Sequence, residues 1–189
     1  MRMQAYRISF LAGMLVLALT FAVQAGEKAS PEVLALAKGE LAQLGADPVL
    51  VEAVKAENSK GKTLDQIKER DKKWMATAGM DDFMRSIQGN AAAKRLLEIQ
   101  QSAPYFAEIF LTDNQGANVA MTDKTSDYWQ GDEAKFSKCF TGDAGTIFVS
   151  DVEFDKSAQA YLAQVSVPVL DDGKAIGVLV IGIDVEKLK

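Results

Sequence analysis

The spacing of apolar residues changes along this chain, from a helical period in the first half to a strand period near 2 in the second. Residues 176–183 are the strongest part of the second pattern, because they are apolar at nearly every position. A strand of this kind is covered on both faces, so it belongs in the centre of a sheet. The pattern therefore predicts an α+β fold in which helices come first and a sheet follows.

Helix signals dominate residues 26–103. Ser30 is a capping serine, and it is followed by a proline at the first helical position. The apolar stripe that follows predicts a long helix that is bent or broken near Pro48. Further helices are expected after Thr63, which begins a capping box, and over residues 81–101.

Strand signals dominate residues 104–189. Residues 108–112 and 117–121 are predicted to form a hairpin, because the turn-forming sequence Asp-Asn-Gln-Gly separates them. Further elements are expected as a short helix over 132–140 and strands over 146–150, 159–169 and 175–184. The prediction is an antiparallel sheet of about five strands, with the long N-terminal helix on one face and the crossover over residues 122–140 on the other.

The first 25 residues have the pattern of an export signal. Two arginines precede an apolar run over residues 8–23, and a small residue, Ala25, stands at the expected cleavage position. We therefore interpret residues 1–25 as a signal peptide, which leaves residues 26–189 as one structural domain in the periplasm. The alternative is an uncleaved anchor, although a spanning helix needs about 20 apolar residues.

Composition argues against several classes of function. The formal charge is −5, and the leader contains two arginines and no acid, so the mature part is more acidic still and a poor partner for nucleic acid. The chain has no histidine, which removes the commonest general base and metal ligand. We therefore expect no enzyme activity, no cofactor and no metal. Cys139 is the only cysteine, and we expect it to be buried and inert.

The acidic residues between positions 123 and 133 have two interpretations. They are Asp123, Asp127, Asp132 and Glu133. Their spacing does not match the loop of a helix-loop-helix calcium site, so it favours a solvated acidic segment.

Aromatic and acidic residues in the second half are candidates for ligand binding. Tyr128 and Trp129 offer flat apolar faces, while Asp127, Asp151 and Asp184 offer negative charge. Cation–π contact contributes about 0.5 to 2 kcal/mol, so this combination favours an amine or a neutral polar ligand over an anion. The competing interpretation places Trp129 in the core and makes Asp151 and Asp184 caps at strand ends.

Five segments of the second half occur in a recognisable order. They are residues 108–113, 125–133, 154–155, 167–169 and 176–184. In this order they resemble the extracytoplasmic Cache domains, a PAS-like family of single-module sensor domains. The resemblance covers residues 104–185. It implies a curved antiparallel sheet behind a long N-terminal helix, with a small ligand bound in a pocket under the crossover that follows the hairpin.

The resemblance also implies positions for ligand contacts. The crossover aromatic of the family resembles Phe136, the tyrosine before the fourth strand resembles Phe154, and the aspartate at the end of the last strand resembles Asp184. Amino-acid-binding members also have an arginine on the crossover. This chain has no arginine after Arg95, so the fork that would clamp a ligand carboxylate is absent from that position.

These features predict an exported small-molecule-binding sensor domain that acts as a stand-alone periplasmic ligand-binding protein in signal sensing. The alternative is an accessory module for a membrane receptor kinase or chemoreceptor, without a ligand of its own. An enzyme built on Asp/Glu pairs, as glycosidases are, would require a carboxylate pair that faces one cleft. After cleavage we expect no stable membrane insertion, although a membrane sensor protein is a candidate partner.

We expect the exported protein to begin at Gly26, because signal peptidase cuts after a small residue such as Ala25. Mass spectrometry of the periplasmic fraction measures the mature N-terminus. An intact N-terminus recovered from the membrane fraction would instead support the uncleaved anchor.

Overall fold

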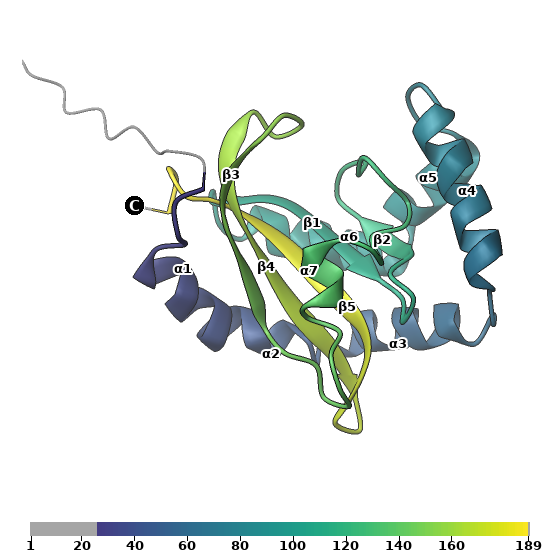
Figure 1. Cartoon of the computed structure of the whole chain (residues 1–189), viewed down its shortest axis with the longest axis horizontal. Helices are drawn as coiled ribbons and strands as arrows, with labels where there is room; N and C mark the ends of the chain where they lie inside the picture. Colours follow the sequence, from purple (N-terminus) through teal and green to yellow (C-terminus); the bar gives the residue numbers. More distant parts are fainter. Residues whose placement is uncertain (1–25, 189) are drawn as a thin grey trace, which may run out of the picture.

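The computed structural model describes residues 26–188, so the predicted signal peptide and Lys189 lie outside the described part. Helices fill the chain up to Gln101 and strands dominate after it (Figure 1). The described helices lack the combination of length and apolar character that a membrane crossing requires. The predicted α+β class is confirmed.

The helical half begins as predicted. Ser30 Oγ accepts a hydrogen bond from the third residue of the first helix, and Asp47 and Thr63 cap later helices in the same way. The chain breaks before Pro48, and the helix expected over 81–101 is split by Asn90, whose side chain caps the second piece. The helices are α1 (Pro31–Leu36), the π-helical segment η1 (Ala37–Leu41), α2 (Ala42–Leu44), α3 (Pro48–Asn58), α4 (Leu64–Ala76), α5 (Asp82–Gly89) and α6 (Ala91–Gln101).

The strands form one antiparallel sheet in the order β2-β1-β5-β4-β3. The last strand lies in its centre, as its apolar sequence predicts, and the first two strands form the expected hairpin. The third strand is longer than the predicted 146–150. The elements are β1 (Phe106–Thr112), β2 (Asn118–Met121), α7 (Ala134–Ser137), β3 (Phe148–Asp155), β4 (Ala160–Asp171) and β5 (Lys174–Asp184).

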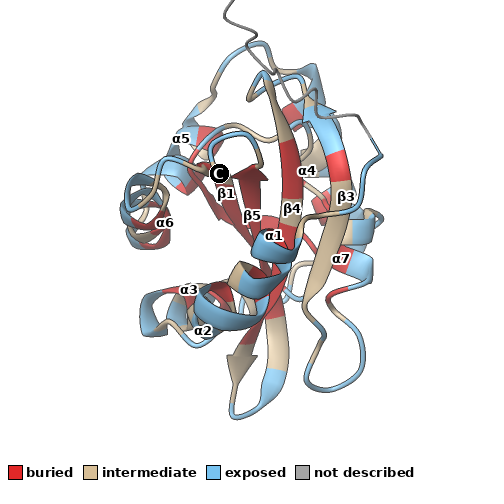
Figure 2. Cartoon of the chain, turned by 90° about the vertical axis from the view of Figure 1, so that its left-hand side faces the viewer, coloured by how far each residue is buried: buried red, intermediate tan, exposed pale blue. Residues whose placement is uncertain are grey.

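A separate core covers each face of the sheet. Figure 2 shows buried residues along β1, β4 and β5, with α1, α2, α3 and α6 lying to one side of these strands. The helix-side core includes Val33, Leu41, Leu50, Val54, Leu96, Leu111, Val165, Val167, Leu179 and Ile181. The crossover-side core includes Ile67, Trp74, Met84, Phe110, Met121, Tyr128, Phe136, Cys139, Val178 and Val180. The predicted two-sided arrangement of helix and crossover is therefore present.

The predicted burial of Cys139 is confirmed. Cys139 is buried, and its burial raises the pKa of the thiol to about 12, so the thiol is unreactive. At the start of the described chain, Gly26 N donates to Val152 O and Val152 N donates to Glu27 O, both over 2.7 Å. These two bonds attach the first described residues to the outer edge of β3.

The substitution Leu179→Ala should lower the free energy of unfolding by about 2 to 5 kcal/mol, because it opens a cavity in the helix-side core. Leu179 is fully buried at the centre of the sheet. Leu97→Ala is the control, since Leu97 is 44% exposed, and it should change the free energy by less than about 1 kcal/mol. Denaturant unfolding of both variants measures the difference, and equal losses would contradict the assignment of the core.

Candidate functional site

A cleft opens on the crossover face of the sheet, between α7 and the hairpin of β3 and β4. It consists of two adjoining cavities of about 520 Å³ and 570 Å³, a size that suits a small ligand. Lys135, Phe154, Asp155 and Gln164 line both cavities and so join them. The first cavity also includes Lys28, Glu133, Lys138, Asp151 and Glu153, and the second also includes Glu108, Phe110, Lys124, Gln130 and Lys156.

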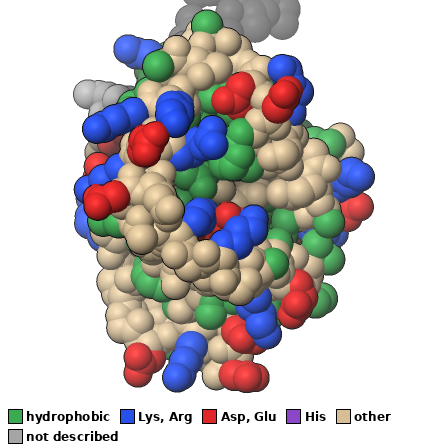
Figure 3. Space-filling view, turned by 90° about the vertical axis from the view of Figure 1, so that its right-hand side faces the viewer, with side chains coloured by type: hydrophobic (Ala, Val, Ile, Leu, Met, Phe, Trp, Pro, Cys, Tyr) green, Lys and Arg blue, Asp and Glu red, His purple; other side chains and the backbone are tan. Residues whose placement is uncertain are grey.

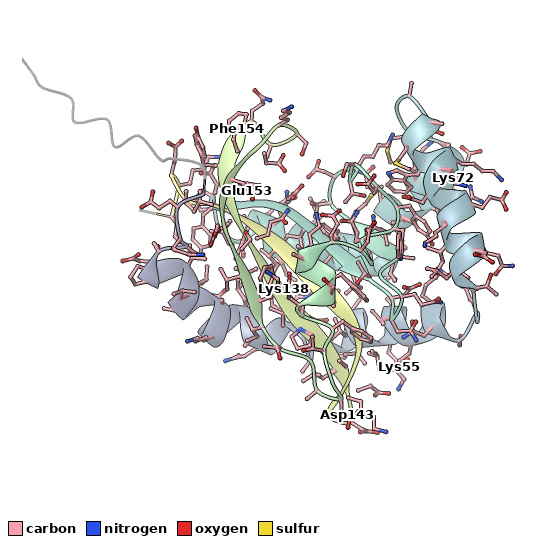
Figure 4. All side chains as sticks on the ribbon, in the orientation of Figure 1. Lys55, Lys72, Lys138, Asp143, Glu153 and Phe154 are labelled. Atoms are coloured by element: carbon pink, nitrogen blue, oxygen red, sulfur yellow. The ribbon has the colours of Figure 1, made fainter. Side chains whose placement is uncertain are left out.

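The labelled side chains in Figure 4 show where the cleft lies on the ribbon. Glu153 and Phe154 come from the upper part of β3, near its turn into β4, and Lys138 lies beside α7. Phe154 is 46% exposed, and its ring packs edge-on against Tyr161 with centroids 5.3 Å apart. Tyr161 packs against the helix-side core, so the ring of Phe154 projects from the helix-side face of the sheet, and the side chains of Glu153, Asp155 and Gln164 face the cleft.

A polar row forms the floor of the second cavity. Glu108 on β1 and Gln164 on β4 both pair with Gly182 on β5, so the two side chains project from the same face of the sheet. Gly182 is required here, because a Cβ at this position would lie 2.8 Å from Glu108 Cγ and 3.1 Å from Leu162 Cδ1. The missing side chain leaves room for Glu108, which accepts a hydrogen bond of 3.3 Å from Gln164 Nε2.

The carboxyl group of Glu108 has an unusual environment. Its burial raises the pKa above the usual range, and the charges of Asp155 and Asp123 raise the pKa further. Lys135 and the hydrogen bond from Gln164 act in the opposite direction without cancelling the effect. Acids with raised pKa values inside clefts are typical of functional sites.

The cleft also contains a buried acceptor without a partner. Gln130 is 1% exposed, and its Nε2 donates to Asp127 O over 2.8 Å. Its Oε1 atom, by contrast, has no hydrogen-bond partner among residues 26–188. The same is true of Ser166 Oγ, which projects from the same face of β4 as Gln164 but lies outside the lining of both cavities.

Several lysines of the cleft are already engaged. Lys28 pairs with Asp151 over 2.8 Å, and Lys135 pairs with Glu133 over 2.9 Å. Lys124 donates to two backbone carbonyls that follow α4. Figure 3 shows the molecule from the side of α4, where hydrophobic side chains lie in a hollow bordered by charges of both signs. The surface around this hollow is therefore mixed in charge and not dominated by one sign.

The structure places Tyr128 in the crossover-side core. It is 2% exposed, and its ring centroid lies 5.7 Å from that of Trp74 and 5.4 Å from that of Phe83. Its hydroxyl accepts a hydrogen bond of 3.0 Å from Lys62, and burial raises the pKa of the phenol. Tyr128 therefore holds the crossover against the helices.

Trp129 faces α4 and the β1–β2 turn. Its Nε1 donates to Gln115 O over 2.8 Å, and Lys68 Nζ lies 4.5 Å from the ring. The backbone N–H groups of Tyr128 and Trp129 both donate to Asp71 on α4, over 2.8 Å and 3.1 Å. This pair of bonds attaches the crossover directly to the helix.

The remaining predicted residues have separate surroundings. Phe136 is 7% exposed and stacks on Phe140 with ring centroids 5.2 Å apart. Asp184 is 3% exposed, accepts from two backbone N–H groups of the turn after β5 and pairs with Lys187 over 2.9 Å. The carboxylate of Asp127 accepts from Ser126 Oγ over 2.7 Å.

Of the predicted site residues, Asp151 and Phe154 line the described cleft, whereas Asp127, Tyr128, Trp129, Phe136 and Asp184 lie outside its lining. Sequence reasoning missed Glu108 and Gln164. The available signal was a glutamine inside an otherwise apolar strand, since buried strands rarely contain an amide without a partner.

Comparisons with known proteins show which solved structures this chain is similar to. No protein-family model and no curated protein matches the chain. It is similar to the ligand-binding domain of the Campylobacter jejuni chemoreceptor Tlp3 in complex with 4-methylisoleucine, with 18% identity, 84% of this chain and 62% of that chain covered, and a TM-score of 0.43. It is also similar to the extracellular domain of the putative histidine kinase rpHK1S-Z16, with 20% identity, 81% and 60% covered, and a TM-score of 0.43.

A third similar structure is the ligand-binding domain of the Pseudomonas aeruginosa chemoreceptor PctC in complex with GABA. Identity is 15%, coverage is 80% of this chain and 61% of that chain, and the TM-score is 0.37. The chain thus spans about six-tenths of the length of these structures. At this level of similarity, the ligands of those proteins do not transfer to this chain.

Glu108→Gln should raise the free energy of unfolding of the ligand-free domain at neutral pH. Because folding raises the pKa of Glu108, the contribution of this carboxyl to stability is fully present at low pH and is lost as pH rises through the raised pKa, whereas glutamine stays neutral. The gain should disappear near about pH 4, where the carboxyl is protonated. Denaturant unfolding at both pH values measures it.

The matched control is Glu40→Gln, which makes the same change at an exposed position of the helical half. It should show no comparable pH-dependent gain. A loss of stability in Glu108→Gln of equal size at both pH values would contradict the account of a desolvated carboxyl.

Proposed function

We propose that this protein is an exported, non-catalytic sensor domain that binds a small molecule in the cleft between α7 and the hairpin of β3 and β4. The observation that carries the proposal is the polar floor of that cleft. Glu108 and Gln164 project from the sheet where apolar residues would otherwise extend the core, and the acceptor of Gln130 nearby has no partner in the described chain. The resemblance of residues 104–185 to Cache domains supports the same location under the crossover.

The crossover is suited to report whether the cleft is occupied. Lys124, Thr125 and Gln130 line the second cavity on one side. On the other side, Trp74 Nε1 donates to Thr125 O over 2.8 Å, and Asp71 accepts from the backbone of the following residues. In the proposal a ligand therefore shifts a segment that is bonded to α4, and α4 transmits the change to a membrane sensor protein.

The proposal retains two of the residues predicted as ligand contacts. Asp151 and Phe154 line the cleft, while Tyr128, Trp129 and Phe136 hold the crossover in place. Lys28, Lys124 and Lys135 are engaged elsewhere and Glu108 is not, which favours an amine or neutral polar ligand over an anion near Glu108. Export to the periplasm and action as a stand-alone protein remain predictions.

A thermal-shift screen tests the function directly. The mature protein is screened against amines, amino acids, organic acids and sugars, because a ligand at 100 times its dissociation constant adds about 2.7 kcal/mol to the stability of the folded state. Stabilisation by one chemical class supports the proposal. Absence of any stabilising compound would favour the accessory module without a ligand of its own.

Gln164→Ala should weaken binding of a compound found in this screen by about 1 kcal/mol, because Gln164 lines both cavities and its side chain projects from the cleft face of the sheet. Gln164 is partly exposed, which keeps the cost to folding small. Gln43→Ala makes the same change at an exposed position of α2 and should leave binding unchanged. Titration calorimetry measures both affinities, and an unchanged affinity in Gln164→Ala would place the ligand elsewhere.

A further inference from the structure

We infer that the second cavity recognises an organic cation with several N–H donors, and that Glu108 is the residue that detects its charge. This inference rests on the proposed function and specifies the chemistry of the same site. It does not require a carboxylate on the ligand.

The first support is a shortage of donors around the acidic floor. Glu108 accepts one long hydrogen bond, from Gln164 at 3.3 Å, and forms no ion pair with a lysine or arginine of residues 26–188. Gln130 lines the same cavity, and its Nε2 is already used in a hydrogen bond to Asp127 O. A carboxylate forms charge-assisted hydrogen bonds when a cationic N–H donor is available, and these are stronger than neutral ones.

The second support is that two of the three lysines that line the second cavity have other partners. Lys135 is the lysine that neighbours both cavities, yet its Nζ pairs with Glu133 over 2.9 Å and lies 5.4 Å from the centroid of the Phe110 ring. Lys124 donates to two carbonyl oxygens outside the cavity. Lys156 also lines this cavity and forms no ion pair within residues 26–188, so an anion could pair with it, but an anion would have to break existing bonds to pair with Lys124 or Lys135. A cation near Glu108 supplies the charged donor that this carboxylate lacks.

The aromatic walls suit the same class of ligand. Phe110 lines the second cavity from the same face of β1 as Glu108, and its ring offers an apolar face to a cation and to its hydrocarbon part. The lining therefore combines an acidic floor, an amide and one aromatic wall. A sugar or a carboxylic acid would not engage the unpaired carboxylate with comparable strength.

Recognition by Glu108 has a consequence for pH. Asp155 of β3 and Asp123 after β2 face the carboxyl with like charge, while Lys135 of α7 opposes them and Gln164 of β4 donates a hydrogen bond. Together with burial, these groups raise the pKa of Glu108. Because a cation pairs with the ionised form, its affinity should fall as pH falls through this pKa.

The experiment uses four probes of similar size and two protein variants. The probes are n-butylammonium, tetramethylammonium, 1-butanol and butyrate, each titrated at millimolar concentration into the mature protein and followed by NMR. We expect binding of n-butylammonium, weaker binding of tetramethylammonium because it has no N–H donor, and no binding of 1-butanol or butyrate. Affinity for n-butylammonium should fall between about pH 8 and about pH 5.

In Glu108→Gln, the affinity for n-butylammonium at about pH 8 should fall by about tenfold or more and lose its pH dependence. The control Glu40→Gln should bind as the native protein does, because Glu40 is exposed on the helical half. Unchanged binding in Glu108→Gln, or equal binding of tetramethylammonium and n-butylammonium, would overturn the inference.

The outcomes also separate this inference from the proposed function. Binding of butyrate or 1-butanol that Gln164→Ala weakens would overturn the cation class while leaving the cleft as a ligand site. If neither the probes nor any compound of the wider screen binds, both the inference and the proposed function fail.

Discussion

The central strand β5 is apolar on both faces, so other parts of the chain must cover each face of the sheet separately. Leu179 and Ile181 face the N-terminal helices, whereas Val178 and Val180 face the crossover. The helical cover extends along the strand. On the other face, the aromatic packing ends before the row of Gly182, where polar side chains replace apolar ones. The cleft thus lies where the second cover stops.

The crossover, which covers the second face, is held by hydrogen bonds and ion pairs as well as by apolar packing. Lys62 Nζ donates to Tyr128 Oη over 3.0 Å and pairs with Glu57 and Asp113 over 2.8 Å and 3.1 Å. Burial alone would lower the pKa of Lys62, but the hydrogen bonds to Glu57 and Tyr128 and the charge of Asp113 raise it. A lysine that stays charged therefore joins α3, the β1–β2 turn and the crossover.

The architecture could be predicted from the sequence, because the spacing of apolar residues determines where helices and strands form and which of them are buried. The hairpin and the central position of the last strand follow from apolar patterns, and both are present. The split at Asn90 was missed because its capping role competes with a continuous apolar stripe. The floor of the cleft was missed for another reason: Glu108 and Gln164 are neighbours only through the register of two strand pairs.

The aromatic pair illustrates the limit of motif reasoning. Tyr128 and Trp129 are adjacent in sequence and both carry polar groups that need partners. The structure provides those partners from the helices and the β1–β2 turn, so both side chains hold the crossover. A sequence pattern identifies side chains that are able to bind a ligand. Only the tertiary contacts show whether their polar groups are already bonded to other parts of the protein.

Gly182 shows how little separates a sheet with a cleft from a closed one. A single β-carbon at this position would contact Glu108 Cγ and Leu162 Cδ1, and the acid would have to leave its place. In the proposed site, one methyl group at this position would therefore displace the acidic floor without altering any charged residue. Sheets that differ only here would keep their architecture and lose this part of the cleft.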